Sequence, residues 1–138
     1  MRDDLTNIEL NPVDYAVISQ ALLASAREMG AKLVRSSYSN IIREAQDGSA
    51  ALFDRHGNVV AQAELIPMQL GPMSDIFRAC AAVIPPETLK PGDFYINNDP
   101  YQGGQHLQDV FIYSPIFFDD ELVGLAGPDC RRRGPDGA

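Results

Sequence analysis

The first periodic segment of the chain predicts a helix that begins at Pro12. Asn11 precedes it as an N-cap residue, and proline is well tolerated at the first helical position. Apolar residues then recur every three or four positions, as on one face of an amphipathic helix. They are Ile18, Leu22, Ala26, Met29 and Leu33. Gly30 weakens the last turn or ends the helix there.

Residues 35–48 are polar and show little periodicity. A long polar connection in an otherwise packed domain is often functional. Two short apolar runs follow, at 49–53 and 58–62, and the turn between them contains Gly57. This arrangement predicts a β-hairpin. His56 lies on the turn, where we expect an exposed side chain rather than a ligand.

The second half of the chain alternates turns with short apolar segments. Residues 66–73 contain Pro67, Gly71 and Pro72 and are expected to be irregular. A helix is predicted from Met73 to Ile84, where two prolines end it. Strands are predicted at 94–96, 110–118 and 121–126. Pro115 suggests an edge or a bulge in the second of these strands. The predicted fold class is therefore α+β, with mixed helices and short antiparallel strands.

The apolar pattern stops at Gly127. The last twelve residues, GPDCRRRGPDGA, have neither a helical nor a strand period. We therefore expect a domain segment at 1–126 and an aberrant, disordered tail at 127–138. Such a tail is either a flexible chain end or the product of a reading-frame change.

Charge and composition exclude several classes of protein. Eleven basic and nineteen acidic residues give a formal net charge of −8, which argues against a nucleic-acid partner. The start, Met1-Arg2-Asp3-Asp4, lacks the apolar stretch of a secretory signal, and no run reaches the length of a membrane span. We expect a cytoplasmic protein without a membrane partner. Cys80 and Cys130 are too few for a disulfide framework, and Cys80 is expected to be a buried thiol.

The stretch from Asn97 to Asp109, NNDPYQGGQHLQD, carries the candidate chemistry. His106 offers an imidazole nitrogen and Asp109 a carboxylate oxygen, and a turn would bring them together. A mixed nitrogen and oxygen set suits zinc, manganese or ferrous iron. Asp99 could be a further ligand, an outer acceptor that holds a ligand imidazole, or a turn residue before Pro100.

Taken alone, a His and an Asp three residues apart are more often an ordinary surface pair. Two protein ligands are also fewer than the three that open catalytic zinc sites usually keep.

The whole string is more specific than the pair. N-D-P-Y-x-G-G-x-H-x-x-D resembles the metal-binding signature of the hydantoinase B/oxoprolinase family, and the resemblance extends from about Pro12 to Ala126. Its other segments include EMG at 28–30, LVR at 33–35, SYS at 37–39, IRE at 42–44, ALFD at 51–54 and KPGD at 90–93.

The resemblance implies a metal held by His106, Asp109 and a third ligand from a later His-His-x-Asp-x-Gly-Gly segment. At about that place this chain has Arg131 and Arg132. A guanidinium stays protonated and is not an ordinary metal ligand, so we expect the third ligand to be missing. Glu44 and Asp47 also match family positions. They are candidates for active-site acids or for residues that order the polar connection.

The resemblance also implies a function. Its members open cyclic amides such as hydantoins and 5-oxoproline with the help of ATP, or carboxylate ketones. The chain contains no G-x-x-x-x-G-K-[ST] phosphate loop, so ATP is expected on a partner, a hydantoinase A-type subunit. We expect a fragment of a metal-dependent hydrolase of cyclic amide C–N bonds, inactive without that partner and the remainder of its own subunit. The alternatives are a fragment of an acetone or acetophenone carboxylase subunit and a non-catalytic remnant or binding module.

Overall fold

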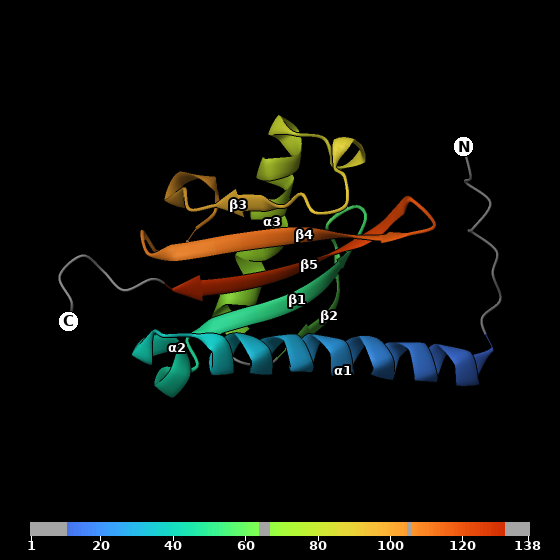
Figure 1. Cartoon of the computed structure of the whole chain (residues 1–138), viewed down its shortest axis with the longest axis horizontal. Coiled ribbons are helices and arrows are strands. Elements are labelled where there is room, and N and C mark those ends of the chain that lie inside the picture. The colour runs from blue at the N-terminus through green and yellow to red at the C-terminus, as the bar shows by residue number, and fades with distance from the viewer. Residues whose placement is uncertain (1–10, 64–66, 105, 132–138) are drawn as a thin grey trace.

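The structure is a computed structural model that describes residues 11–63, 67–104 and 106–131. Five antiparallel strands form one sheet in the order β2-β1-β5-β4-β3, as Figure 1 shows. The strands are β1 (Gly48–Asp54), β2 (Val59–Ala63), β3 (Tyr95–Asn97), β4 (Asp109–Phe118) and β5 (Glu121–Arg131). The helices are α1 (Pro12–Ser36), α2 (Asn40–Ala45) and α3 (Pro67–Val83), with short 3₁₀ helices η2 (Pro86–Thr88) and η3 (Pro100–Gln102). This architecture confirms the predicted α+β class.

The two long helices pack on opposite faces of the sheet. Side chains alternate along a strand, so Leu52 of β1 packs with Ala26 of α1, while its neighbour Phe53 packs with Met73 and Phe77 of α3. The cluster on the α3 face is the larger one. It also contains Ala51, Ile76, Tyr95, Phe111, Tyr113 and Leu125.

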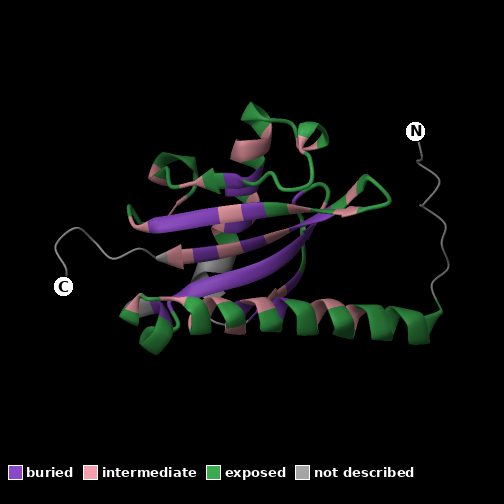
Figure 2. Cartoon of the chain, in the orientation of Figure 1, coloured by how far each residue is buried: buried purple, intermediate pink, exposed green. Residues whose placement is uncertain are grey.

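Helix α1 begins as the sequence predicts. The Asn11 side chain accepts a hydrogen bond from the Val13 N–H at 3.0 Å, and Pro12 occupies the first turn. Gly30 does not end the helix, which continues to Ser36. Gly30 itself is buried. The first turns project beyond the sheet, and Figure 2 shows their residues as exposed. Their exposed side chains include Val13, Tyr15 and Val17.

Three local predictions were wrong. The connection at 35–48 contains α2, which Ile42 anchors with a buried side chain. The segment around Pro72 is helical, because α3 already begins at Pro67. Proline in a helix interior removes a hydrogen bond, but the turns after Pro72 bury Met73, Ile76 and Phe77, and this burial offsets the loss.

The third correction concerns the end of the sheet. We expected the strand to end at Ala126 and an aberrant tail to begin at Gly127, but β5 continues to Arg131. Residues 127–130 pair with β1, from Ala51↔Gly127 to Gly48↔Cys130. Pairing with strands on both sides overrides the low strand propensity of glycine, proline and aspartate. Residues 132–138 lie outside the described part of the chain.

Pro115 behaves as predicted for a proline in a strand. It pairs with Leu125 of β5, but β3 spans only the part of β4 from Phe111 to Tyr113. Pro115 therefore lies where β4 has no neighbour on its other side, and a register shift follows between Ile116 and Phe117. Within the described ranges, no helix has the length and apolar character needed to cross a membrane.

Two tyrosine hydroxyls of the sheet form hydrogen bonds with α3 and with Ile84, the residue that directly follows it. The Tyr113 hydroxyl donates to the Met73 carbonyl at 2.7 Å, and the Tyr95 hydroxyl donates to the Ile84 carbonyl at 2.7 Å. Their rings make edge-to-face contacts with Phe77. Burial raises the pKa of Tyr95 to about 12, and burial also raises the pKa of Tyr113.

This arrangement predicts an alkaline loss of stability. Because the pKa of Tyr95 is higher in the folded chain than the ordinary value of 10.0, its contribution is complete below pH 10 and is lost as the pH rises through about 12. Tyr95→Phe removes the hydrogen bond, which costs about 1 kcal/mol at neutral pH, and should flatten the decline between pH 10 and 12. Urea unfolding at several pH values measures both effects. Tyr15→Phe, at an exposed position, is the control. An unchanged slope in Tyr95→Phe would contradict this assignment.

A second prediction concerns Gly103, which follows η3. Gly103 has φ +104°, and a Cβ there would lie 3.0 Å from Cγ1 of the buried Ile76. Gly92 has φ +96°, but nothing lies within 4 Å of its Cβ position. Both alanine substitutions carry a backbone cost of about 1 to 2 kcal/mol. Gly103→Ala should destabilise the chain further, because Ile76 must also move. Equal losses in the free energy of unfolding would show that the contact with Ile76 costs nothing.

Candidate metal-binding site

The signature segment forms the link between β3 and β4. It leaves β3 at Asn97, makes the single turn of η3, turns back at Gly103 and enters β4 at Asp109. Asp99 caps η3, because its Oδ1 accepts the Tyr101 N–H at 2.9 Å. This contact is the turn role considered for Asp99, and a role of Asp99 at a metal stays a prediction.

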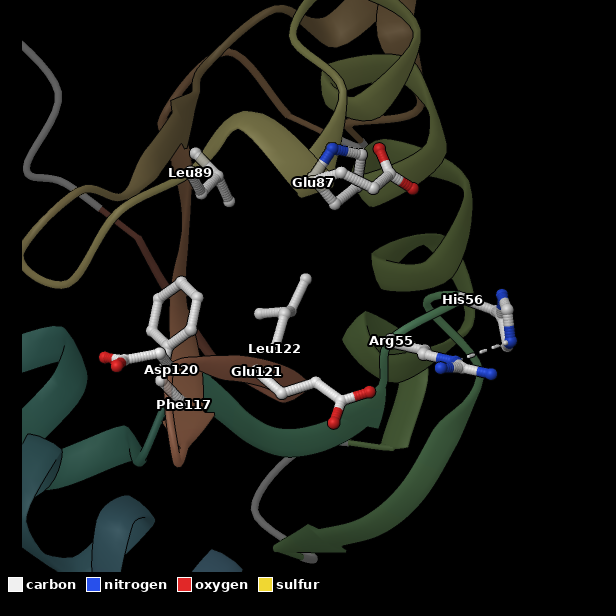
Figure 3. A pocket seen from close by; sticks show the side chains of 9 residues that line it. Arg55, His56, Glu87, Leu89, Phe117, Asp120, Glu121 and Leu122 are labelled. Carbon is white, nitrogen blue, oxygen red and sulfur yellow. Dashed lines mark hydrogen bonds between the residues drawn. The ribbon is translucent and has the colours of Figure 1, made fainter. Parts of the chain in front are cut away.

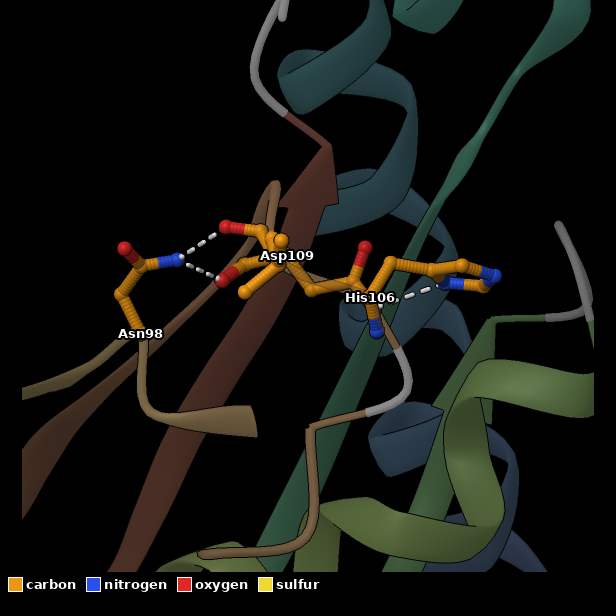
Figure 4. Close-up of polar contacts among 4 residues, drawn as sticks. Asn98, His106 and Asp109 are labelled. Atoms are coloured by element: carbon orange, nitrogen blue, oxygen red, sulfur yellow. Dashed lines mark hydrogen bonds and ion pairs between the residues drawn. The ribbon is translucent and has the colours of Figure 1, made fainter. Parts of the chain in front are cut away.

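His106 and Asp109 contact each other directly. Asp109 Oδ2 accepts the backbone N–H of His106 at 3.0 Å and lies 3.1 Å from Nδ1 of the His106 ring. The Asp109 N–H in turn donates to the His106 carbonyl at 3.2 Å. The carboxylate side chain is 1% exposed and the imidazole 44% exposed. The turn therefore places a buried carboxylate oxygen beside an accessible imidazole nitrogen, and both atoms are possible metal ligands (Figure 4).

The distance between these atoms fits two ligands of one divalent ion. With metal–ligand bonds near 2.1 Å, adjacent ligands lie about 3.0 Å apart in octahedral and about 3.4 Å apart in tetrahedral geometry. The observed 3.1 Å lies within that range. The same contact also suits a carboxylate that orients an imidazole whose other nitrogen binds the metal. Among residues 11–63, 67–104 and 106–131, no group of three or more His, Cys, Asp or Glu residues could hold an ion.

The end of β5 returns the chain to this pair. In the β4–β5 register, Arg131 stands opposite Asp109. Arg131 is one of the two arginines found where the resemblance places the third ligand, and Arg132 lies outside the described residues. The residue at this register position is therefore a direct neighbour of Asp109 across the sheet.

Asp47 and Glu44 lie in different surroundings. Asp47 is buried and directly precedes Gly48, whose partner Cys130 also pairs with Val110 of β4. The register therefore places Asp47 at the Asp109 end of the sheet, two strands away, or about 10 Å. Glu44 is exposed on α2. Figure 1 shows α2 at this end of the sheet.

The sequence interpretation missed two further buried polar residues. Ser49 and Asp129 are both fully buried and are partners in the β1–β5 register. Alternation along the strands puts them on the α3 face, together with Asp109. The sequence signal for them was that every second residue from Leu125 through Gly127 to Asp129 continues one face of β5. The sequence interpretation had assigned the part from Gly127 onward to the tail. The end of the sheet at Asp109 therefore holds several buried polar groups on one face.

An open groove of about 610 Å³ lies beside the signature segment. The last turns of α3 and strand β3 supply its mostly apolar wall, and Asn97, Asp99 and Gln102 supply polar groups. Cys80 also lines this groove, where its thiol is half-buried rather than fully buried as predicted, and this partial burial raises the pKa of the thiol. A mostly apolar groove with a few polar groups is typical of sites for small organic ligands.

A second hollow of about 430 Å³ lies at the opposite end of the sheet (Figure 3). Arg55 and His56 from the β1–β2 turn line it, together with Glu87 and the β4–β5 hairpin. His56 is exposed, as predicted, and its ring accepts a hydrogen bond from Arg55 Nε at 3.3 Å. The full length of β4 separates this hollow from Asp109, a distance of about 30 Å. His56 therefore belongs to a different part of the molecule from the His106–Asp109 pair.

Comparisons with known proteins agree with the structure. Residues 11–130 match the sequence profile of the hydantoinase B/oxoprolinase family. A 5-oxoprolinase of Saccharomyces cerevisiae is 38% identical over 110 residues, which are 80% of this chain and 8% of the relative. The caprolactamase subunit beta of Pseudomonas jessenii is 34% identical over 114 residues, which are 83% of this chain and 19% of the relative.

Two solved structures share the fold. The ATP-dependent caprolactamase from Pseudomonas jessenii superimposes with a TM-score of 0.80 at 31% identity, over 90% of this chain and 21% of that chain. A nucleotide-free acetone carboxylase superimposes with a TM-score of 0.79 at 21% identity, over 89% of this chain and 16% of that one; this likeness shows the fold alone. The chain spans less than a quarter of the curated relatives it matches. On the profile match and these identities, the chain belongs to the hydantoinase B/oxoprolinase family.

Proposed function

We propose that this chain is the N-terminal part of a metal-dependent subunit in an ATP-dependent hydrolase of cyclic amides. The observation that carries the proposal is the contact of His106 with Asp109, which places a nitrogen and an oxygen donor 3.1 Å apart at the start of β4. Family membership supports the same function, because hydantoinases and oxoprolinases act on ring amides. Zinc, manganese or iron would suit these donors.

The chain's own residues would hold and orient the metal rather than complete its coordination. Asp109 is fixed in the sheet and nearly buried, while the imidazole of His106 remains accessible. A third ligand would come from a segment next to the end of β5, where the register places Arg131 opposite Asp109. When bound, a divalent ion would polarise a carbonyl oxygen or provide a bound hydroxide. Asp47 and Glu44 remain candidates for active-site acids.

The amide branch of the family is the better supported one. The caprolactamase structure is 31% identical to this chain, against 21% for acetone carboxylase. That caprolactamase is ATP-dependent, whereas this chain has no phosphate loop of its own. We therefore expect ATP to bind a hydantoinase A-type partner subunit, and a small cyclic amide to be the substrate. The exposed apolar first turns of α1 would suit contact with the rest of the subunit.

Metal titration tests the donor pair. The purified chain should bind Mn²⁺, Zn²⁺ or Co²⁺ weakly, because the described residues offer only a pair of ligands at this site. His106→Ala should abolish the binding, while His56→Ala, at the other end of the sheet, should leave it unchanged. Isothermal titration calorimetry measures both variants. Tight stoichiometric binding that survives His106→Ala would show that the ligands are other residues.

Activity measurements test the place of the chain in a larger enzyme. The chain alone should not open hydantoin, 5-oxoproline or caprolactam, with or without ATP, because the described residues supply no third ligand to this pair and the assay contains no ATP-binding partner. Mass spectrometry of the ring-opened product gives the measurement. Turnover by the pure chain that Asp109→Ala abolishes would contradict this expectation.

A further inference from the structure

Asn98 connects β3 to the loop that holds the donor pair. It follows Asn97, the last residue of β3, and its side-chain amide faces the His106–Asp109 turn (Figure 4). The amide nitrogen donates to the Leu107 carbonyl at 3.1 Å and also to the Asp109 carbonyl. One side chain therefore holds two carbonyl groups of a four-residue turn.

This contact extends the connection between β3 and β4 beyond their backbone pairing. The register of the two strands ends at Asn97↔Phe111, and Phe111 lies two residues after Asp109, the first residue of β4. Beyond the last backbone pair, the Asn98 side chain continues the connection, because it donates a hydrogen bond to the backbone carbonyl of Asp109. The first residue of β4 is therefore held by β5 on one side and by Asn98 on the other.

A metal site needs ligands whose orientation is fixed before the ion arrives, and neighbouring hydrogen bonds commonly fix it. Asp109 presents a carboxylate, and the carbonyl of the same residue accepts from Asn98. Leu107 lies between His106 and Asp109 in the sequence, and its carbonyl accepts a hydrogen bond from the same amide. Fixing these two carbonyls restricts the backbone rotations that would separate Nδ1 of His106 from Oδ2 of Asp109.

We propose that Asn98 is the positioning residue of the His106–Asp109 donor pair, and that its amide sets the affinity of the pair for a divalent ion. The inference rests on the proposed function, because it assumes that the pair binds metal. Asn98 acts through the backbone of the turn, so it contributes no ligand atom in this role.

Two variants separate geometry from charge. Asn98→Ala removes the amide, whereas Asn98→Asp keeps the shape, removes both donated hydrogen bonds and adds a negative charge. Added negative charge alone would favour a cation, so weaker binding by both variants would identify the lost hydrogen bonds as the cause. Asn58→Ala is the matched control. Its amide donates to Asp54 Oδ2 at 2.8 Å in the β1–β2 turn, at the other end of the sheet.

Two measurements are made on each variant. Titration with Co²⁺ or Mn²⁺ should show an affinity at least about 10-fold lower in both Asn98 variants, and unchanged in Asn58→Ala. Amide hydrogen exchange without metal should become faster at His106 and Asp109, whose N–H groups close the turn. Exchange in β1 should stay the same, which separates an effect on the turn from global unfolding.

The outcomes distinguish this inference from the proposed function. Metal binding that is unchanged in both Asn98 variants would overturn the role of Asn98 and leave the metal site standing. A wild-type chain that binds none of these ions would contradict the proposed function and this inference together. Weaker binding accompanied by equally faster exchange in β1 would show a general structural role and would also overturn the inference.

Discussion

The pairing of β4 with β5 is the constraint on which the rest of the structure depends. Side chains alternate between the faces of a sheet, so one register commits Asp109, Phe111 and Tyr113 together to the α3 face. A slip by one residue would turn all three to the opposite face. The same register that buries two core aromatic rings therefore also buries the candidate ligand and sets Arg131 opposite it.

The two ends of this sheet differ in chemical character. At the Asp109 end, the α3 face carries buried polar groups on three successive strands, which include Ser49, Asp109 and Asp129. At the opposite end, charged side chains of two turns surround an open hollow. Burying a carboxylate costs free energy unless hydrogen bonds or charges offset it, so protein interiors rarely accumulate such groups without a reason. The structure concentrates them where the signature segment enters the sheet.

Helix α3 connects this polar end to the hydrophobic core. Tyr113 and Tyr95 form hydrogen bonds with the helix and with the residue that directly follows it, and Ile76 of the same helix touches the turn at Gly103. The turn at Gly103, in the loop that leads to His106, therefore lies next to the apolar cluster on the α3 face. These contacts connect the position of the proposed metal ligands to the packing of the core.

Much of the fold could be predicted from the sequence. The N-cap at Asn11, the hairpin around Gly57, the helix after Met73 and the strands near 110–126 each follow from local signals, and the structure has all of them. The wrong predictions concern residues whose state long-range contacts decide. Pro72 lies within a helix because the turns after it fill the core, and residues 127–131 form a strand because β1 and β4 pair with them.

The sequence by itself determined which residues could carry chemistry, because the spacing of His106 and Asp109 and the composition of their string are local properties. Only the tertiary structure decided how those residues are held. Asn98 is nine and eleven residues away from the carbonyls it binds, and Asp129 comes to the same face through strand pairing. Neither relation has a local signature, because both depend on a register fixed by the burial of side chains elsewhere in the sheet.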